Sequence, residues 1–203
     1  MQLVCLGDSI TDCNRLFEDF PLGNGYVQIL SREFQKTHRT VSIKNYGVDG
    51  FTLSRVLENV LHGQINLHRT PVITLLIGIN DIGLMLNTDR TAAQKEQMMN
   101  DFFIRYEYLL KLLIEKARKV IVMEPFIFPR PEKYKLWIPY VQTMGQGIQQ
   151  IAENFHINCL SLHNYLNDAA SREGFSSVTI DGIHLTKHGH ELLATKLYPL
   201  ISA

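Results

Sequence analysis

The sequence predicts an α/β domain whose core is a mostly parallel β-sheet. Five short runs rich in Val, Ile and Leu alternate with longer stretches in which apolar residues recur every three to four positions. These are the periodicities of buried strands and amphipathic helices, and their alternation is typical of a parallel sheet covered by helices on both faces. Right-handed crossovers then place the carboxyl ends of all strands at one edge, where open α/β sheets bind ligands.

The elements follow one another in a regular order along the chain. The expected strands are 3–6, 41–45, 71–77, 120–123 and 157–160, and the expected helices are 26–34, 53–61, 92–117, 138–155 and 188–201. The helix at 92–117 has the strongest pattern. It opens with Thr91 and Gln94 at the spacing of a capping box, in which each residue satisfies a backbone N–H of the other.

Composition limits the classes of protein to which the chain can belong. It has 203 residues with 20 Lys and Arg, 20 Asp and Glu, and 45% hydrophobic residues, the balance of a globular protein with one full core. We therefore expect a single domain over 1–203. The neutral charge lacks the basic excess of a nucleic-acid binder. No apolar run reaches the roughly 18 residues of a membrane span.

The amino terminus and the cysteines indicate a cellular compartment. The chain runs from Met1 almost directly into the first strand pattern, without the basic and apolar segments of an export signal. Its three cysteines, Cys5, Cys13 and Cys159, are scattered and odd in number, as expected of reduced thiols. We expect a cytoplasmic protein without a disulfide framework.

Three of the predicted strands end in polar loops that contain glycine. Ser9 lies in Gly-Asp-Ser-Ile after the first strand, Gly50 in Asn-Tyr-Gly-Val-Asp-Gly after the second, and Asn80 in Gly-Ile-Asn-Asp after the third. Glycine permits positive φ and a close backbone approach. Each fragment alone is typical of an ordinary turn or helix cap, but three at successive strand ends indicate a functional edge.

A fourth fragment near the carboxyl terminus supplies a candidate acid–base pair. Asp181 precedes His184 by three residues, close enough for its carboxylate to accept a hydrogen bond from Nδ1–H of the ring. That bond fixes the tautomer and leaves Nε2 free to act as a base. Serine is a weak nucleophile unless such a base takes its proton, so Ser9 is the candidate nucleophile.

These fragments, in this order, resemble the four sequence blocks of the SGNH hydrolases, the superfamily also called GDSL esterases and lipases. The resemblance implies a three-layer α/β/α sandwich, flavodoxin-like, whose five-stranded parallel sheet has the order 2-1-3-4-5. The blocks read Gly7-Asp8-Ser9-Ile10, Asn45-x-Gly47-x-x-Gly50, Gly78-x-Asn80-Asp81 and Asp181-x-x-His184.

The resemblance also implies a role for each residue. Ser9 would be the nucleophile, His184 the base and Asp181 the residue that orients the base. The oxyanion hole would consist of the backbone N–H groups of Ser9 and Gly50 and the side-chain amide of Asn80. The glycine donor in this family is the later one of the second block. An esterase of this kind needs no metal and no organic cofactor.

The identity of the ester is less sharply indicated. The stretch 7–15, followed by Gly23-x-Gly25, is similar to the SGNH branch that contains xylan and carbohydrate acetylesterases, which favours short acyl groups, acetyl above all. The form Asp-Gly-Ile-His at 181–184 is instead common in the thioesterase and lysophospholipase branch. A catalytically inactive ligand-binding relative is disfavoured because every expected catalytic position is filled. The expected partner is a small-molecule ester, and homo-oligomerisation is left open.

Two segments and a histidine cluster have alternative interpretations. The segment 126–137, which contains the only tryptophan, is either a substrate-lining loop or lid, or a polar surface loop or oligomer contact. The segment 82–91 is either the start of a helix or a border of the part of the site that holds the acyl group of the ester. His188 and His190 follow His184 closely, but no His-Glu-x-x-His occurs. We therefore expect them to cap or solvate the last helix instead of binding a metal.

Overall fold

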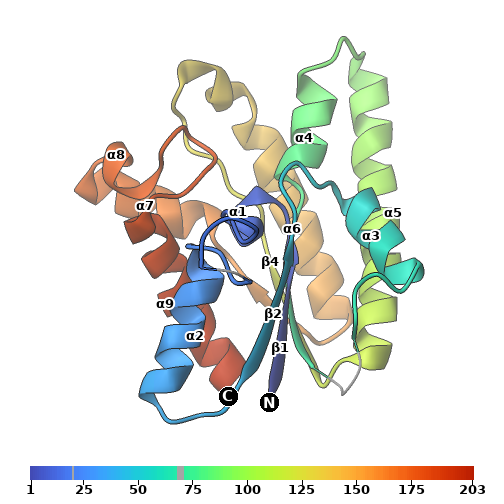
Figure 1. Cartoon of the computed structure of the whole chain (residues 1–203). Helices are drawn as coiled ribbons and strands as arrows, with labels where there is room; N and C mark the ends of the chain where they lie inside the picture. The colour runs from blue at the N-terminus through green and yellow to red at the C-terminus, as the bar shows by residue number, and fades with distance from the viewer. Residues whose placement is uncertain (20, 68–70) are drawn as a thin grey trace.

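In the computed structural model, which describes residues 1–19, 21–67 and 71–203, five parallel strands form a sheet of order β2-β1-β3-β4-β5. Helices cover both faces of the sheet, so the molecule has three layers (Figure 1). The predicted flavodoxin-like α/β/α arrangement and its strand order are confirmed. The strands are β1 (Gln2–Gly7), β2 (Ser42–Gly47), β3 (Val72–Leu76), β4 (Lys119–Met123) and β5 (Asn158–Leu160).

The periodic patterns in the sequence correspond to helices whose bounds lie within two residues of those predicted. The helices are α1 (Ser9–Asp12), α2 (Tyr26–Lys36), α3 (Leu53–Leu61), α4 (Ile79–Leu86), α5 (Ala92–Lys116), the 3-10 helix η1 (Glu132–Leu136), α6 (Ile138–Asn154), α7 (His163–Glu173), α8 (Phe175–Val178) and α9 (Lys187–Ser202). The capping box is present at the start of α5, where the side chains of Thr91 and Gln94 each accept from the other's backbone N–H. The helices α1, α7, α8 and η1 have no counterpart among the predicted elements.

Strand side chains alternate between two apolar layers. Leu3 and Cys5 of β1 pack toward α2, α7 and α9, whereas Val4 and Leu6 pack toward α3, α5 and α6. All four side chains are fully buried, which explains why the central strands read as continuous apolar runs in the sequence. Among the helices of the described residues, none is both long and apolar enough to cross a membrane.

The register brings three strand ends to the same level. Gly7 pairs with Gly47 of β2 and with Leu76 of β3. The loops that follow β1, β2 and β3 therefore leave the sheet together, and α1 lies over this edge (Figure 1). Ser9, Gly50 and Asn80 follow these strand ends. Ser9 begins α1, Gly50 lies in the loop after β2, and Asn80 lies in the first turn of α4.

Candidate active site

Ser9 begins α1, directly after β1, and contacts the loop that precedes α9. Its Oγ is 2.9 Å from Nε2 of His184, and Nδ1 of His184 is 2.7 Å from Oδ2 of Asp181. The structure thus brings together residues that lie up to 175 positions apart in the chain. When Nδ1–H donates to the carboxylate, Nε2 accepts from the Ser9 hydroxyl, which is the arrangement that transfers a serine proton to histidine.

The loop that carries Asp181 and His184 is a tight turn fastened by Thr179. The Thr179 hydroxyl donates to the His184 carbonyl at 2.8 Å and accepts from the Gly182 N–H at 2.9 Å. The Ile180 N–H donates to the same His184 carbonyl at 2.9 Å. Thr179 is buried, so the base of the turn is fixed, while the side chains of His184 and Asp181 remain 43% and 48% exposed.

Asp181 is held in its charged form by its own turn. Oδ1 accepts from the backbone N–H groups of Ile183 at 2.9 Å and His184 at 2.8 Å, and Oδ2 contacts the His184 ring. Burial raises the pKa of Asp181, but these hydrogen bonds and the charge of His184 more than offset that effect, so the pKa lies below its usual value. The carboxylate is therefore available to stabilise a protonated His184.

Gly182 docks this turn on the segment 126–137. Its φ is +96°, and a Cβ at this position would collide with the carbonyl oxygen of Arg130, so the backbone requires glycine. The Gly182 carbonyl accepts from the Phe128 N–H at 2.9 Å. Residues 126–128 are fully buried. The first part of the segment is therefore a buried support for the turn, and its interpretation as a polar surface loop is wrong there.

Asp8, which precedes Ser9, is almost fully buried beneath the site. Its Oδ1 accepts from the Ile10 N–H at 3.1 Å and thereby caps α1. Burial raises the pKa of the Asp8 carboxyl to about 7, against the opposing effects of this hydrogen bond and the charge of His184, and the Asp81 carboxylate adds to the rise. Carboxyl groups with pKa values shifted toward neutrality are enriched at functional sites.

Asn45, at the end of β2, ties the Ser9 helix to the sheet. Its buried amide donates from Nδ2 to the carbonyls of Thr11 at 2.6 Å and Leu22 at 2.8 Å, and its Oδ1 accepts from the Gly47 N–H at 2.8 Å. A Cβ on Gly47 would collide with the backbone of α1. Asn45 and Gly47 of the second block therefore position the helix that begins with Ser9. The sequence did not reveal this role.

Gly50 and Asn80 lie beside one another, joined through Phe51. Asn80 donates from Nδ2 to the Phe51 carbonyl at 2.9 Å, and because an amide NH₂ has two hydrogens, one remains for another acceptor. Gly50 has a φ of +72°, and apart from Gly50 and its two chain neighbours no described residue has an atom within 4 Å of where its Cβ would be. Its backbone therefore faces open space, unlike that of Gly47. Ser9 contributes an N–H in the first turn of α1, where amides lack a partner within the helix. The role of all three as oxyanion donors stays a prediction.

A cavity of about 360 Å³ opens beside Gly50 and Asn80. It is lined by Gly50, Thr52, Ile79, Asn80, Gly83, Leu84, Asn87, Thr88, Lys133, Tyr134, Trp137 and Ile183. The Trp137 side chain is 8% exposed and packs against Gly83, where a Cβ would lie 3.3 Å from the indole Cη2. The second half of the segment 126–137 therefore forms a wall of this cavity.

Helix α4 supplies another wall of the same cavity. Leu84 is 53% exposed and lines the cavity, whereas its neighbour Met85 is buried in the core. The interpretation of the segment 82–91 as a helix is confirmed for its first part, and whether Leu84 borders the acyl group stays a prediction. Helix α4 begins three residues earlier than that segment, at Ile79.

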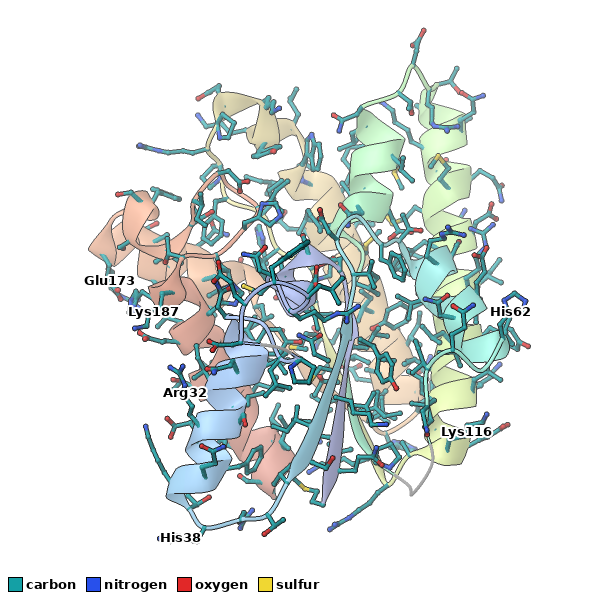
Figure 2. The ribbon with its side chains drawn as sticks, viewed as in Figure 1. Arg32, His38, His62, Lys116, Glu173 and Lys187 are labelled. Carbon is teal, nitrogen blue, oxygen red and sulfur yellow. The ribbon has the colours of Figure 1, made fainter. Side chains whose placement is uncertain are left out.

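The histidines at the start of α9 have different surroundings. His188 is partly exposed, and its Nε2 lies 2.6 Å from a carboxylate oxygen of Glu173 on the outer flank of the molecule (Figure 2). His190 is only 4% exposed, and its Nδ1 accepts from the Tyr26 N–H at 3.2 Å. Burial lowers the pKa of His190 to about 4, with the charge of His184 acting in the same direction. The prediction that both cap or solvate α9 is therefore wrong for His190. In the ranges that the structure covers, no three His, Cys, Asp or Glu side chains are grouped to hold a metal ion.

Comparison with known proteins finds similarity over almost the whole chain. The GDSL-like lipase/acylhydrolase family matches residues 5–192. An acetylxylan esterase of Geobacillus stearothermophilus is 26% identical over 95% of this chain and 90% of its own length. The human isoamyl acetate-hydrolyzing esterase 1 homolog is 22% identical over 98% of this chain and 81% of its own.

Solved structures share the fold at lower sequence identity. The acetylxylan esterase Axe2 from Geobacillus stearothermophilus superposes with a TM-score of 0.84 at 21% identity, over 100% of this chain and 94% of that one. LAE5, an alpha/beta hydrolase enzyme from the metagenome of Lake Arreo in Spain, gives 0.82 at 20% identity, over 99% and 94%. Three Axe2 structures are of catalytic mutants that replace a serine, an aspartate or a histidine with alanine, the last two three positions apart.

Proposed function

The chain belongs to the GDSL-like lipase/acylhydrolase family and is a carboxylic ester hydrolase, and from that premise we propose that it is a serine esterase for short acyl groups. Its substrates are acetyl esters of carbohydrates or of other small alcohols. The observation that carries the proposal is the row of hydrogen bonds from Ser9 through His184 to Asp181, beside Gly50 and Asn80.

Acylation begins when Ser9 Oγ attacks the ester carbonyl carbon and its proton passes to Nε2 of His184. The carbonyl electron pair moves onto the oxygen, whose charge is stabilised by the N–H groups of Ser9, Gly50 and Asn80. Donors aimed at this position act only as the charge develops, and removing one typically lowers the rate about 100- to 1000-fold. The bond to the alcohol oxygen then breaks, and protonated His184 gives that oxygen its proton.

Deacylation repeats the same steps with water. His184 takes a proton from water as the water oxygen attacks the acyl-enzyme, and the oxyanion forms again at the same donors. The bond to Ser9 Oγ breaks, Oγ takes the proton from His184, and the carboxylic acid leaves. In both steps Asp181 holds the imidazole in one tautomer and stabilises its charged form.

The acetyl preference is supported by what the relatives have in common. One is named for acetylxylan and the other for isoamyl acetate, so their alcohols differ while the acyl group is the same. The cavity beside Gly50 and Asn80 combines the rings of Tyr134 and Trp137 with polar groups such as Lys133. This mixture of apolar walls and a few polar groups suits an alcohol larger than the acetyl group.

A thioesterase or lysophospholipase is the second candidate. The cavity also has apolar side chains from Ile79, Leu84 and Ile183, and Ile183 belongs to the Asp-Gly-Ile-His turn that is common in that branch. If the acyl chain lies along these side chains, the enzyme accepts long acyl groups with the same mechanism. The two candidates therefore differ in the part of the substrate that occupies the cavity.

Hydrolysis of p-nitrophenyl esters from acetate to decanoate, with Ser9→Ala as the blank, tests both. We expect a steep fall in kcat/KM beyond acetate, with no turnover by the variant. A preference for longer chains would instead favour the thioesterase or lysophospholipase. A fluorophosphonate probe should label the wild-type protein and not Ser9→Ala. Absence of both labelling and Ser9-dependent turnover would make the inactive ligand-binding relative the better interpretation.

A further inference from the structure

Asp81, the residue after Asn80, reaches the start of α3. Its two carboxylate oxygens lie 3.3 and 3.1 Å from the backbone nitrogen of Leu53, which donates to them across 28 positions of sequence. Leu53 is the first residue of α3, and the N-cap Thr52 makes no side-chain capping bond to any described group. The carboxylate that caps this helix therefore comes from the first turn of a different helix, α4.

Asn80 binds the backbone two residues before Leu53. It donates from Nδ2 to the Phe51 carbonyl at 2.9 Å, so two consecutive side chains of the first turn of α4 bind the backbone at Phe51 and Leu53. Gly50 directly precedes this pair, and its positive φ and open surroundings give its own position little packing support. The backbone that follows Gly50 is thus fixed from the first turn of α4.

We propose that Asp81 is a positioning residue for the oxyanion hole. By fixing the first turn of α3, it sets the Gly50 N–H at the distance from the Asn80 amide that one oxyanion requires. This inference rests on the proposed function, because it assumes that Gly50 and Asn80 donate to the same oxygen. Such donors act at about 2.7–3.1 Å, and a displacement of about 1 Å lowers catalysis roughly 100-fold.

Electrostatics agree with a capping role. A carboxylate is stabilised at a helix N-terminus by the unpaired N–H groups and the helix dipole. Burial raises the pKa of Asp81 to about 6, and the Leu53 N–H and the charge of Arg105 act against that rise. Arg90, Asp101 and Arg105 line a separate cavity of about 280 Å³ together with Asp81. Asp101 is therefore an acidic residue of the same cavity that can serve as a control for Asp81.

The test compares Asp81→Ala and Asp81→Asn with Asp101→Asn as the control. Each is assayed on p-nitrophenyl acetate and on the thiono analogue that has sulfur in place of the carbonyl oxygen. Sulfur accepts hydrogen bonds weakly, so the preference for the oxygen ester reports on the oxyanion hole. We expect Asp81→Ala to lower kcat by about 10- to 100-fold, with KM within about threefold, and to reduce that preference. Asp81→Asn keeps an acceptor oxygen and should restore most of the activity, and Asp101→Asn should match the wild type.

If Asp81→Ala keeps the wild-type kcat and the wild-type preference for the oxygen ester, and only its melting temperature is lower, the proposal is overturned. Asp81 would then be a helix cap alone. If Asp81→Ala does not fold, Asp81→Ser asks the same question, because it removes the carboxylate and keeps a small polar side chain at this partly buried position. A loss of oxygen preference in Asp81→Ser supports the proposal, and its retention contradicts it. Absence of Ser9-dependent turnover in the wild type would refute the proposed function separately.

Discussion

The loop with the proposed acid–base pair and the proposed oxyanion side of the site meet at Ser9, and they are held in place by different means. In the acid–base loop, Asp181 lies three residues from His184, and its contacts are within its own turn. On the oxyanion side, Asn80 and Asp81 bind backbone groups 28 or 29 positions away. The first region is fixed mainly within its own turn, which Gly182 docks on the segment 126–137, whereas the second depends on contacts between the first turn of α4 and residues 51–53.

The carboxyl groups of the two regions titrate in opposite directions. Asp181 is about half exposed, and hydrogen bonds hold its pKa below the usual value. Asp8 and Asp81 are more buried, and burial raises their pKa values to about 7 and about 6. In the proposed mechanism, a charged carboxylate is useful beside His184, which becomes protonated, and unfavourable beside a developing oxyanion. Aspartate is thus held ionised at position 181 and is more readily protonated at positions 8 and 81.

Replacement of Asp181 by Asn should have the largest effect of the changes that separate the two regions. The amide cannot stabilise the protonated ring and favours the wrong tautomer, so we expect kcat to fall about 1000- to 10,000-fold, with a small change in melting temperature. Steady-state kinetics and thermal unfolding measure the two effects. His188→Gln, on the exposed flank of α9, should keep wild-type activity. A loss below tenfold would mean that another group orients His184.

Asn80→Ala should have the next largest effect, on the oxyanion side. Its amide strengthens its bond only as negative charge develops, so we expect kcat to fall about 100- to 1000-fold while KM changes little. Asn100→Ala, on the outer surface of α5, is the matched control. An effect confined to KM would assign Asn80 to binding of the substrate in its ground state instead.

The sequence predicts the framework of both regions and the positions of their chemical groups. The central strands are buried on both faces and the long helices are amphipathic, so each leaves a periodic pattern. Helix α1 has four residues, too few for a period, and α7 buries mainly Leu166 and two alanines, which give a weak pattern. These helices were therefore not predicted.

The contacts that hold the site were harder to predict than its reacting groups. Asn45 acts through the backbone carbonyls of Thr11 and Leu22, which lie close to it only in the folded chain. Thr179 acts through backbone groups of its own turn, which any residue could supply. Asp81 follows a predicted site residue directly, but its partner is the N–H of Leu53, and every residue except proline has such a group. Side-chain identity in the sequence therefore does not mark these partners.

The smallest expected effect concerns stability, and it tests the contrast between the carboxyl groups. Burial raises the pKa of Asp8 from 3.8 to about 7, so between about pH 4 and pH 7 the folded chain retains a proton that the unfolded chain releases. This group therefore lowers the free energy of unfolding as the pH rises through that window, by roughly 1.4 kcal/mol for each pH unit. Asp181 has a lowered pKa, and its contribution is present above pH 4 and is lost below it.

Asp8→Asn removes the buried titration and keeps an oxygen for the Ile10 N–H. We expect its melting temperature to rise relative to the wild type between pH 4.5 and pH 7.5, by about 3–10 °C at the upper end, in thermal unfolding followed by circular dichroism. Asp168→Asn, at an exposed position of α7, should leave the pH profile unchanged. If the melting temperature of Asp8→Asn instead changes with pH in parallel with that of the wild type, Asp8 is ionised across this range. Both sides of the site then hold charged carboxylates, and the electrostatic contrast between them fails. Asp81→Asn should give the same change over a window that ends about one pH unit lower, because burial raises its pKa only to about 6.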